Sequence, residues 1–181
     1  MIMDDLKNKN IALFGNGMSC IYHERPNIDS EHDVYIRINK GSPKRNEIHI
    51  GSKTDIVALS LNLDEEQIED LYGNVEKLIY CSPKNREFLN DYLKNNCDFY
   101  PEQNWNVLNG ILGSRPSTGI MMIDFLWCYS EFKELHLFGF DGWNTPNIYT
   151  NNNHIGPNDP MSEREYIDLL IKNSKKVFRH E

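Results

Sequence analysis

The sequence lacks a long apolar run, a pairing pattern among its cysteines and any excess of positive charge. No stretch approaches about 18 consecutive apolar residues, and residues 1–5 are acidic where a secretory signal would be basic. We therefore expect a soluble, cytoplasmic protein without an integral membrane segment. Its 19 basic and 27 acidic residues give a formal net charge of −8. Because this charge repels phosphate backbones, we do not expect nucleic-acid binding.

The cysteines also lack the spacing of a metal or redox site. Cys20, Cys81, Cys97 and Cys128 form no Cys-x-x-Cys pair, and no set of Cys and His residues has zinc-ligand spacing. We expect them to be buried free thiols in a reducing compartment. No metal site is predicted.

Apolar runs alternate with polar breaks along the whole chain. The 181 residues match the size of one domain, and 39% hydrophobic with 25% charged residues is typical of globular proteins. Strands are predicted at residues 10–14, 33–39, 54–60, 76–81, 135–139 and 177–178. Helices are predicted at residues 64–72, 84–94, 116–132 and 162–172, with caps at Ser117 or Thr118 and at Ser162. The pattern predicts a single α/β domain over residues 1–181, Rossmann-like, with a mostly parallel sheet flanked by helices.

A glycine-rich loop follows the first predicted strand. Gly15, Asn16 and Gly17 stand where the carboxyl edge of a parallel sheet binds ligands, and glycine lets the backbone approach a phosphate or ribose closely. The dinucleotide fingerprint Gly-x-Gly-x-x-Gly is incomplete, because Cys20 replaces its third glycine and no acidic residue ends the second strand. A tight turn without a ligand is the alternative interpretation.

Further stretches follow this loop in a fixed order. Residues 33–39 read Asp-Val-Tyr-Ile-Arg-Ile-Asn, and residues 51–55 read Gly-Ser-Lys-Thr-Asp. Residues 116–119 read Pro-Ser-Thr-Gly before a helix, and residues 134–140 read Glu-Leu-His-Leu-Phe-Gly-Phe. Together with the glycine loop, this ordered set resembles the long and short motifs of the sialyltransferases, over roughly residues 10–172. The chain resembles both the animal-type family 29 and the bacterial family 42.

The resemblance implies a sialyltransferase-type variant of the GT-A fold and a glycosyltransferase activity. Such enzymes move sialic acid or a similar sugar from a cytidine monophosphate (CMP) donor to a hydroxyl acceptor on a glycan or another molecule, with inversion. Metal-dependent sugar transferases usually hold their ion with an Asp-x-Asp triplet, which is missing here, and a CMP-sugar carries only one phosphate. We therefore expect a metal-independent mechanism without a cofactor. The identity of the sugar and assembly into a homo-oligomer stay open.

The resemblance also implies a set of donor-binding residues. The glycine loop and the end of the second strand would bind ribose and phosphate. The backbone at the start of the helix at 116–132 would contact the cytosine ring. In family 42, two tyrosines six residues apart follow Gly-x-Asp; here the first of these positions is a tryptophan. The implied binding residues are Gly15, Asn16, Gly17, Asn39, Ser117, Thr118, Gly119, Asp141 and Trp143.

Three residues are implied to take part in the reaction. Tyr149, at the second tyrosine position, would donate a hydrogen bond to the leaving phosphate. Arg115, together with Arg37, would supply positive potential near the anionic donor. His154 would be the general base that accepts the proton of the acceptor hydroxyl.

The position of the base differs between the two families. In family 42 a loop histidine precedes a glutamate of the last helix by about ten residues, and His154 ahead of Glu165 fits this spacing. In family 29 a histidine precedes a glutamate by five residues, and here Asn158 stands five residues before Glu163. His154 matches the family 29 pattern only if an insertion is allowed.

Each assigned side chain has a structural alternative. In this alternative, Arg37 pairs with a carboxylate, and Thr118 only caps a helix. Asp141 would stabilise its own turn, Tyr149 would anchor a loop, and His154 would be solvated.

Functions of different classes remain open. The leading hypothesis is the CMP-sugar transferase, and the alternative is a non-catalytic CMP-binding module or a subunit that needs a partner for the acceptor site. The alternative arises because the chain is shorter than the members of both families and carries Trp143 at a tyrosine position. A dehydrogenase is disfavoured by the incomplete dinucleotide fingerprint.

Overall fold

The computed structural model describes residues 4–84, 86–150 and 157–180. In this part of the chain one sheet contains seven strands in the order β5-β4-β3-β2-β1-β6-β7, and every neighbouring pair is parallel. The strands are β1 (Asn10–Phe14), β2 (Val34–Ile38), β3 (Ile56–Leu59), β4 (Lys77–Tyr80), β5 (Cys97–Phe99), β6 (Glu134–Phe138) and β7 (Val177–His180). The predicted α/β class with a parallel sheet is confirmed.

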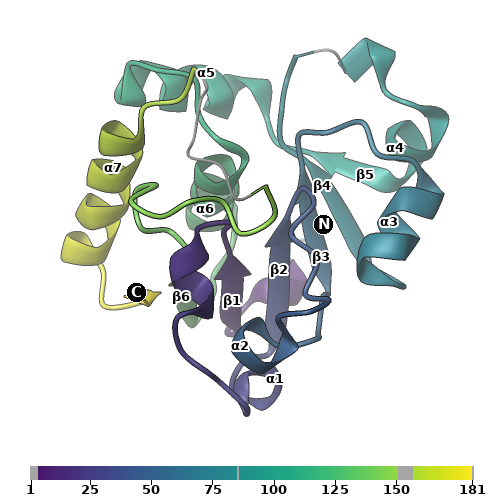
Figure 1. The fold of residues 1–181 in the computed structure, drawn as a ribbon. Helices are drawn as coiled ribbons and strands as arrows, with labels where there is room; N and C mark the ends of the chain where they lie inside the picture. The colour runs from purple at the N-terminus through teal and green to yellow at the C-terminus, as the bar shows by residue number, and fades with distance from the viewer. Residues whose placement is uncertain (1–3, 85, 151–156, 181) are drawn as a thin grey trace.

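Helices cover both faces of this sheet (Figure 1). The helices are α1 (Ile28–Glu31), α2 (Glu47–Ile50), α3 (Glu65–Tyr72), α4 (Asp91–Asn96), α5 (Glu102–Leu112), α6 (Thr118–Tyr129) and α7 (Pro160–Asn173). Three short 3-10 helices are η1 (Asp4–Leu6), η2 (Met18–Ile21) and η3 (Arg86–Phe88).

Alternating side chains of each strand fill two separate cores. In β1, Ile11 and Leu13 pack into the core beneath α5, α6 and α7, whereas Ala12 and Phe14 face α1, α2 and η2. On that second face, β3 and β4 pack against α3 and α4 in a further cluster of their own. Because successive strand residues point to opposite faces, apolar residues at every position give a sheet that is buried on both sides.

The order of the strands places a ligand site at the end of β1. From β1 the chain runs outward through β2 to β5, and then it returns to β6 on the other side of β1 (Figure 1). The connections therefore leave β1 and β6 in opposite directions, and this topological switch point opens a crevice at the carboxyl ends of the strands. The glycine loop lies there: the Gly15 amide donates to the Phe138 carbonyl at 2.7 Å, and the Gly17 amide donates to the Gly139 carbonyl at 3.2 Å.

Two predictions about the helices were wrong, and two elements were missed. The helix predicted at 84–94 is divided into η3 and α4, because the Asn90 side chain accepts from the Leu93 amide at 2.9 Å and caps a new helix. The last helix begins at Pro160 and is capped by Asp159 instead of Ser162. Strand β5 and helix α5 were not predicted, although Pro101 precedes α5 and Gly113, at φ 64°, ends it.

The cysteines are free, but only Cys20 and Cys81 are buried; Cys97 is half-buried and Cys128 is exposed. Burial of all four thiols was therefore a wrong prediction. Among the described residues, no helix combines the length and apolarity needed to cross a bilayer.

Candidate functional site

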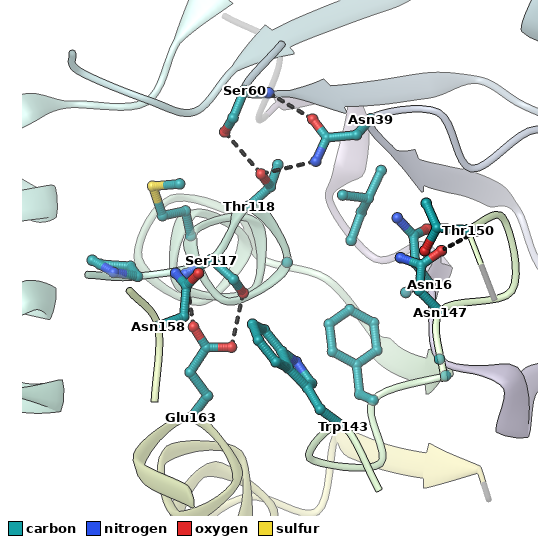
Figure 2. A pocket seen from close by; sticks show the side chains of 18 of the residues that line it. Asn16, Asn39, Ser60, Ser117, Thr118, Trp143, Asn147, Thr150, Asn158 and Glu163 are labelled. Atoms are coloured by element: carbon teal, nitrogen blue, oxygen red, sulfur yellow. Dashed lines mark hydrogen bonds between the residues drawn. The ribbon is translucent and has the colours of Figure 1, made fainter. Parts of the chain in front are cut away.

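A cavity of about 810 Å³ opens at the carboxyl ends of the strands. Most of the residues assigned to the donor site line it, namely Gly15, Asn16, Gly17, Asn39, Arg115, Ser117, Thr118, Gly119 and Trp143. Residues that the sequence analysis did not assign also line it, among them Ser60, Phe140, Asn147, Asn158 and Glu163. In Figure 2, Asn158 and Glu163 lie across the cavity from Asn16 and Asn147. The fold thus gathers segments that are up to about 150 residues apart in the sequence.

The two glycines of the loop are explained by close packing against the end of β6. A Cβ atom at Gly15 or Gly17 would lie 2.7 or 2.8 Å from the carbonyl oxygen of Gly139. Only hydrogen fits there, so the tight-turn interpretation accounts for both positions. Asn16 between them lines the cavity, and its buried Oδ1 atom has no hydrogen-bond partner among the described residues. An orphaned buried acceptor at a cavity wall is a group that a ligand donor can satisfy.

The Asn39 side chain is held by a network of hydrogen bonds at the ends of β2 and β3. Its Oδ1 accepts from the Ser60 amide at 2.8 Å, and its Nδ2 donates to Thr118 Oγ1 at 3.1 Å. Thr118 Oγ1 in turn lies 2.8 Å from Ser60 Oγ (Figure 2). The Tyr72 hydroxyl donates to the Asn39 carbonyl at 2.6 Å, which supports the left-handed backbone of this residue at φ 53°. One Nδ2 proton of Asn39 remains for a ligand, since an amide nitrogen carries two.

The start of α6 supplies three neighbouring residues to the cavity. Ser117 is the cap, because its hydroxyl accepts from the Ile120 amide at 3.3 Å. Thr118 therefore does not cap the helix, and its hydroxyl belongs to the Asn39 network. Gly119 packs so tightly that a Cβ atom would lie 2.8 Å from the ring of Phe140. The amides of Thr118 and Gly119 stand at the positive end of a helix of 12 residues.

Glu163 of α7 reaches the same helix start and was not found from the sequence. Its Oε1 accepts from the Ser117 amide at 2.7 Å, and its Oε2 accepts from the Ser117 hydroxyl at 2.8 Å. The residue is only 5% exposed. Burial raises the pKa of this carboxyl to about 7, although the two Ser117 hydrogen bonds act in the opposite direction. A carboxyl group that ionises near neutrality thus lines the cavity.

Asn158 stands beside Glu163 in the wall of the cavity (Figure 2). Its Nδ2 donates to the Arg115 carbonyl at 2.6 Å and thereby fixes the segment that leads into α6. The two residues five apart, which the family 29 comparison singled out, therefore both face the cavity, with an amide at the first position. Arg115 is the single cation among the described residues that line it.

Two assigned residues of the loop after β6 do not line the cavity. Asp141 is buried and accepts a hydrogen bond from the Thr145 hydroxyl, and its carbonyl accepts from Asn144 Nδ2 at 2.7 Å. Thr145 Oγ1 also accepts from the Ser19 amide at 3.2 Å, so Asp141 ties this loop to the glycine loop. Its position agrees with the turn-stabilising alternative, and direct donor contact is not what this geometry offers.

Tyr149 lies in the same loop, where its amide donates to Asn147 Oδ1 at 2.9 Å. Burial raises the pKa of its hydroxyl, with the Cys20 thiolate acting in the same direction and the Arg37 guanidinium in the opposite one. The side chain is half-buried and does not line the cavity. His154, the assigned base, lies outside the described residues.

Arg37 is bound by main-chain carbonyls and not by a carboxylate. The side chain is fully buried and donates to the main-chain carbonyls of Ile50, Gly51 and Lys53 at 2.9 to 3.2 Å. Its guanidinium also lies 4.6 Å from the centre of the Phe14 ring. Pairing with a carboxylate was a wrong prediction, and Arg37 does not line the cavity. It holds the segment that follows α2 against the sheet.

Groups of three or more His, Cys, Asp or Glu residues with the geometry of a metal site do not occur among the described residues. The polar groups that converge on the cavity are amides, hydroxyls, one guanidinium and one carboxyl group. This set suits recognition of a small anion and its attached hydroxyl-rich groups.

Comparison with known proteins finds similarity at the level of structure. Neither protein-family models nor curated protein sequences match the chain. A mammalian sialyltransferase superposes with a TM-score of 0.63 at 20% identity, covering 95% of this chain and 68% of that one. The sialyltransferase CstII from Campylobacter jejuni, solved with cytidine-5′-monophosphate, gives 0.63 at 17% identity, covering 96% and 80%. The same enzyme with the analogue CMP-3FNeuAc gives 0.64 at 14% identity, covering 95% and 81%. The chain therefore has the fold of the sialyltransferases.

Proposed function

We propose that this chain is a glycosyltransferase that takes sialic acid or a similar sugar from a CMP-activated donor. The observation that carries the proposal is the cavity at the switch point between β1 and β6, where Asn16, Asn39 and the start of α6 converge on a sialyltransferase fold. A structural neighbour from Campylobacter jejuni was solved with CMP, which supports this choice of nucleotide. The acceptor in the proposal is a hydroxyl group of a glycan or another molecule.

The charges of the cavity suit a donor with a single phosphate. The amides of Thr118 and Gly119 would face the phosphate at the positive end of α6, and Arg115 would add one full charge. The orphaned Oδ1 of Asn16 would accept from a ribose hydroxyl, and the remaining Nδ2 proton of Asn39 would be donated to a ribose hydroxyl or a phosphate oxygen. Phe140 and Trp143 offer apolar surfaces for the flat parts of the nucleotide.

The proposed reaction is a single displacement with inversion and without a metal. The acceptor oxygen forms a bond to the anomeric carbon, the bond from that carbon to the phosphate oxygen breaks, and CMP leaves with the electron pair. The proton of the acceptor hydroxyl goes to a general base, for which we propose His154. Arg115 and the helix amides would stabilise the charge on the leaving phosphate, while Tyr149 would have to change position to contribute.

A non-catalytic CMP-binding module is the second candidate. It is favoured by the loop after β6, where Trp143 occupies the first tyrosine position and Tyr149 does not line the cavity. The two candidates differ in chemistry alone, since both require CMP to bind.

Release of CMP from CMP-sialic acid separates the two candidates. The transferase should release CMP slowly in water and faster with an acceptor; the disaccharide Gal-beta-1-3GalNAc-ortho-nitrophenol, held by a solved mammalian sialyltransferase, is a suitable acceptor probe. His154→Ala should lose transfer and keep its affinity for CMP, with His23→Ala as the matched control at an exposed position. Transfer at the wild-type rate in His154→Ala would remove His154 as the base, and binding without any turnover would favour the module.

A further inference from the structure

A second cavity of about 450 Å³ adjoins the first at the carboxyl ends of β3 and β4. Ser60 lines both cavities, so an occupant of the second would lie next to the contents of the first. The other lining residues are Leu61, Asn62, Tyr80, Phe88 and Leu89. The cavity therefore lies beside the proposed donor site and on the same edge of the sheet.

The lining of this second cavity is neutral. None of its described lining residues is charged, whereas the first cavity contains Arg115 and Glu163. Phe88 is 73% exposed and Leu61 is 40% exposed, so both present apolar surface that the core does not use. The hydroxyls of Ser60 and Tyr80 lie beside this surface, and Tyr80 Oη is 3.4 Å from the Ser60 carbonyl. An apolar wall with neighbouring hydroxyls suits a neutral ligand with one apolar face and several hydroxyl groups.

The walls are held in place before any ligand binds. Asn62 Oδ1 accepts from the amide and from Nδ2 of Asn90, both at 3.0 Å, and Asn62 Nδ2 donates to the Phe88 carbonyl at 3.2 Å. Leu89 is 4% exposed and anchors the segment that carries Phe88 in the core of α3 and α4. The loop after β3 and the segment before α4 are thus joined, and a ligand need not order them.

We propose that this second cavity binds the acceptor as a neutral sugar whose apolar face lies against Phe88. The inference rests on the proposed function, because it identifies the second substrate of that reaction. A pyranose ring presents C–H groups on one face and hydroxyls at its rim, which match Phe88 and the hydroxyls of Ser60 and Tyr80. From this position an acceptor hydroxyl would reach the donor sugar past Ser60, which is shared by the two cavities.

Phe88→Ala tests the proposal, with Ile111→Ala as the matched control. Both side chains are largely exposed, at 73% and 62%, so neither change should unfold the protein, and Ile111 on α5 lines neither cavity. Phe88→Ala should raise the KM for the disaccharide probe about tenfold or more, while CMP affinity and hydrolysis of CMP-sialic acid stay at wild-type levels. An unchanged KM would overturn the proposal, and so would an equal loss of donor hydrolysis, because that result would assign the cavity to the donor sugar.

Saturation-transfer NMR with the disaccharide probe alone tests the site without any donor. We expect saturation transfer from the protein to the sugar protons with the wild type and with Ile111→Ala. This saturation transfer should be lost with Phe88→Ala. No transfer to the wild type, or equal transfer to Phe88→Ala, would overturn it. Failure of CMP to bind would leave this result standing and would contradict the proposed function alone.

Discussion

Glu163 places a carboxyl group where an anionic ligand would also gather. Its two oxygens accept from Ser117 at the start of α6, and its pKa is raised to about 7 because the group is buried. Between pH 6 and 8 the group therefore passes from mostly neutral to mostly charged. A negative charge beside a bound phosphate costs free energy, since like charges in a cavity of low polarity repel.

We predict that the affinity for CMP falls as the pH rises through about 7. Glu163→Gln should remove this dependence, because glutamine carries no charge and its oxygen can still accept from the Ser117 amide. Glu165→Gln on the exposed side of the same helix is the control and should behave as the wild type. Calorimetric titrations with CMP at pH 6, 7 and 8 measure the effect. If Glu163→Gln keeps the full pH dependence, another group, such as His154, is responsible.

The sequence predicted some residues of the site and missed others. Asn39 and Gly119 were assigned because each belongs to a motif at the end of a strand or the start of a helix. Glu163 entered only as the glutamate of the family 29 spacing and was not assigned to the site, since nothing local shows that α7 brings it to Ser117. Asp141 and Tyr149 were assigned by position in a motif, but the residues that reach a cavity depend on the path of the loop, and neither of these two lines the cavity.

At the scale of the element, the start of α6 is shaped by the absence of a side chain at Gly119. A Cβ atom there would lie 2.8 Å from the Phe140 ring and 3.3 Å from Ile38 Cδ1. Glycine inside a helix ordinarily costs about 0.5–1 kcal/mol relative to alanine, so packing must outweigh propensity at this position.

We predict that Gly119→Ala lowers the free energy of unfolding by about 1–3 kcal/mol and weakens CMP binding, because Phe140 has to move. Gly110→Ala in the last turn of α5 is the matched control: no atom lies within 4 Å of its added Cβ, so it should stabilise the fold by up to about 0.5–1 kcal/mol. Urea denaturation of both variants measures the difference. Equal stabilisation by the two substitutions would contradict the packing argument.

Elements with a clear apolar period were predicted, and short or interrupted ones were not. Strands β1, β2, β3, β4 and β6 and helices α3 and α6 stand within one to three residues of their predicted bounds at either end. Strand β5 has only three residues, too few for a period. The helix predicted at 84–94 failed because its apolar residues continue across Asn90, whose side chain starts a new helix. The spacing of apolar residues contains no information about such a capping hydrogen bond.

At the scale of the whole molecule, a group of histidines joins the last strand to the sheet. His136 of β6 and His180 of β7 lie 2.9 Å apart between Nδ1 and Nε2, and His136 Nε2 lies 3.3 Å from Glu134 Oε2. His180 also stacks on Phe138, with ring centres 4.5 Å apart. Burial, followed by the charges of His136 and Arg25, lowers the pKa of His180 to about 4.

The sign of the pH effect follows from this lowered pKa. As the pH falls, the unfolded chain protonates His180 near pH 6.5, whereas the folded chain protonates it only near pH 4. The contribution of His180 to the free energy of unfolding is therefore complete above pH 6.5 and is lost as the pH falls toward 4. Glu163 acts in the opposite direction, because its raised pKa makes the fold less stable as the pH rises from 4.5 to 7. The wild-type profile therefore contains these two opposing contributions, and His32, whose pKa burial also lowers, acts in the same direction as His180.

We predict that Glu163→Gln makes the effect of His180 on the pH dependence of stability visible, because it removes the opposing effect of Glu163. In this background the free energy of unfolding, measured by urea denaturation, should fall steadily between pH 6.5 and 4.5. Adding His180→Asn should flatten that profile, and adding His23→Asn, an exposed position, should leave it unchanged. A profile that keeps its slope without His180 would show that this histidine does not titrate as described.

The first cavity combines the features from which we propose CMP as its ligand. The strand order, the orphaned Asn16 oxygen, the Asn39 network and the start of α6 all lie at one switch point, on a fold shared with the sialyltransferases. The most direct test is calorimetric titration of the wild-type protein with CMP, UMP, AMP and GMP under the same conditions at pH 6. We expect saturable binding of CMP at least about tenfold tighter than that of the other three. Absence of binding, or equal affinity for all four nucleotides, would contradict it.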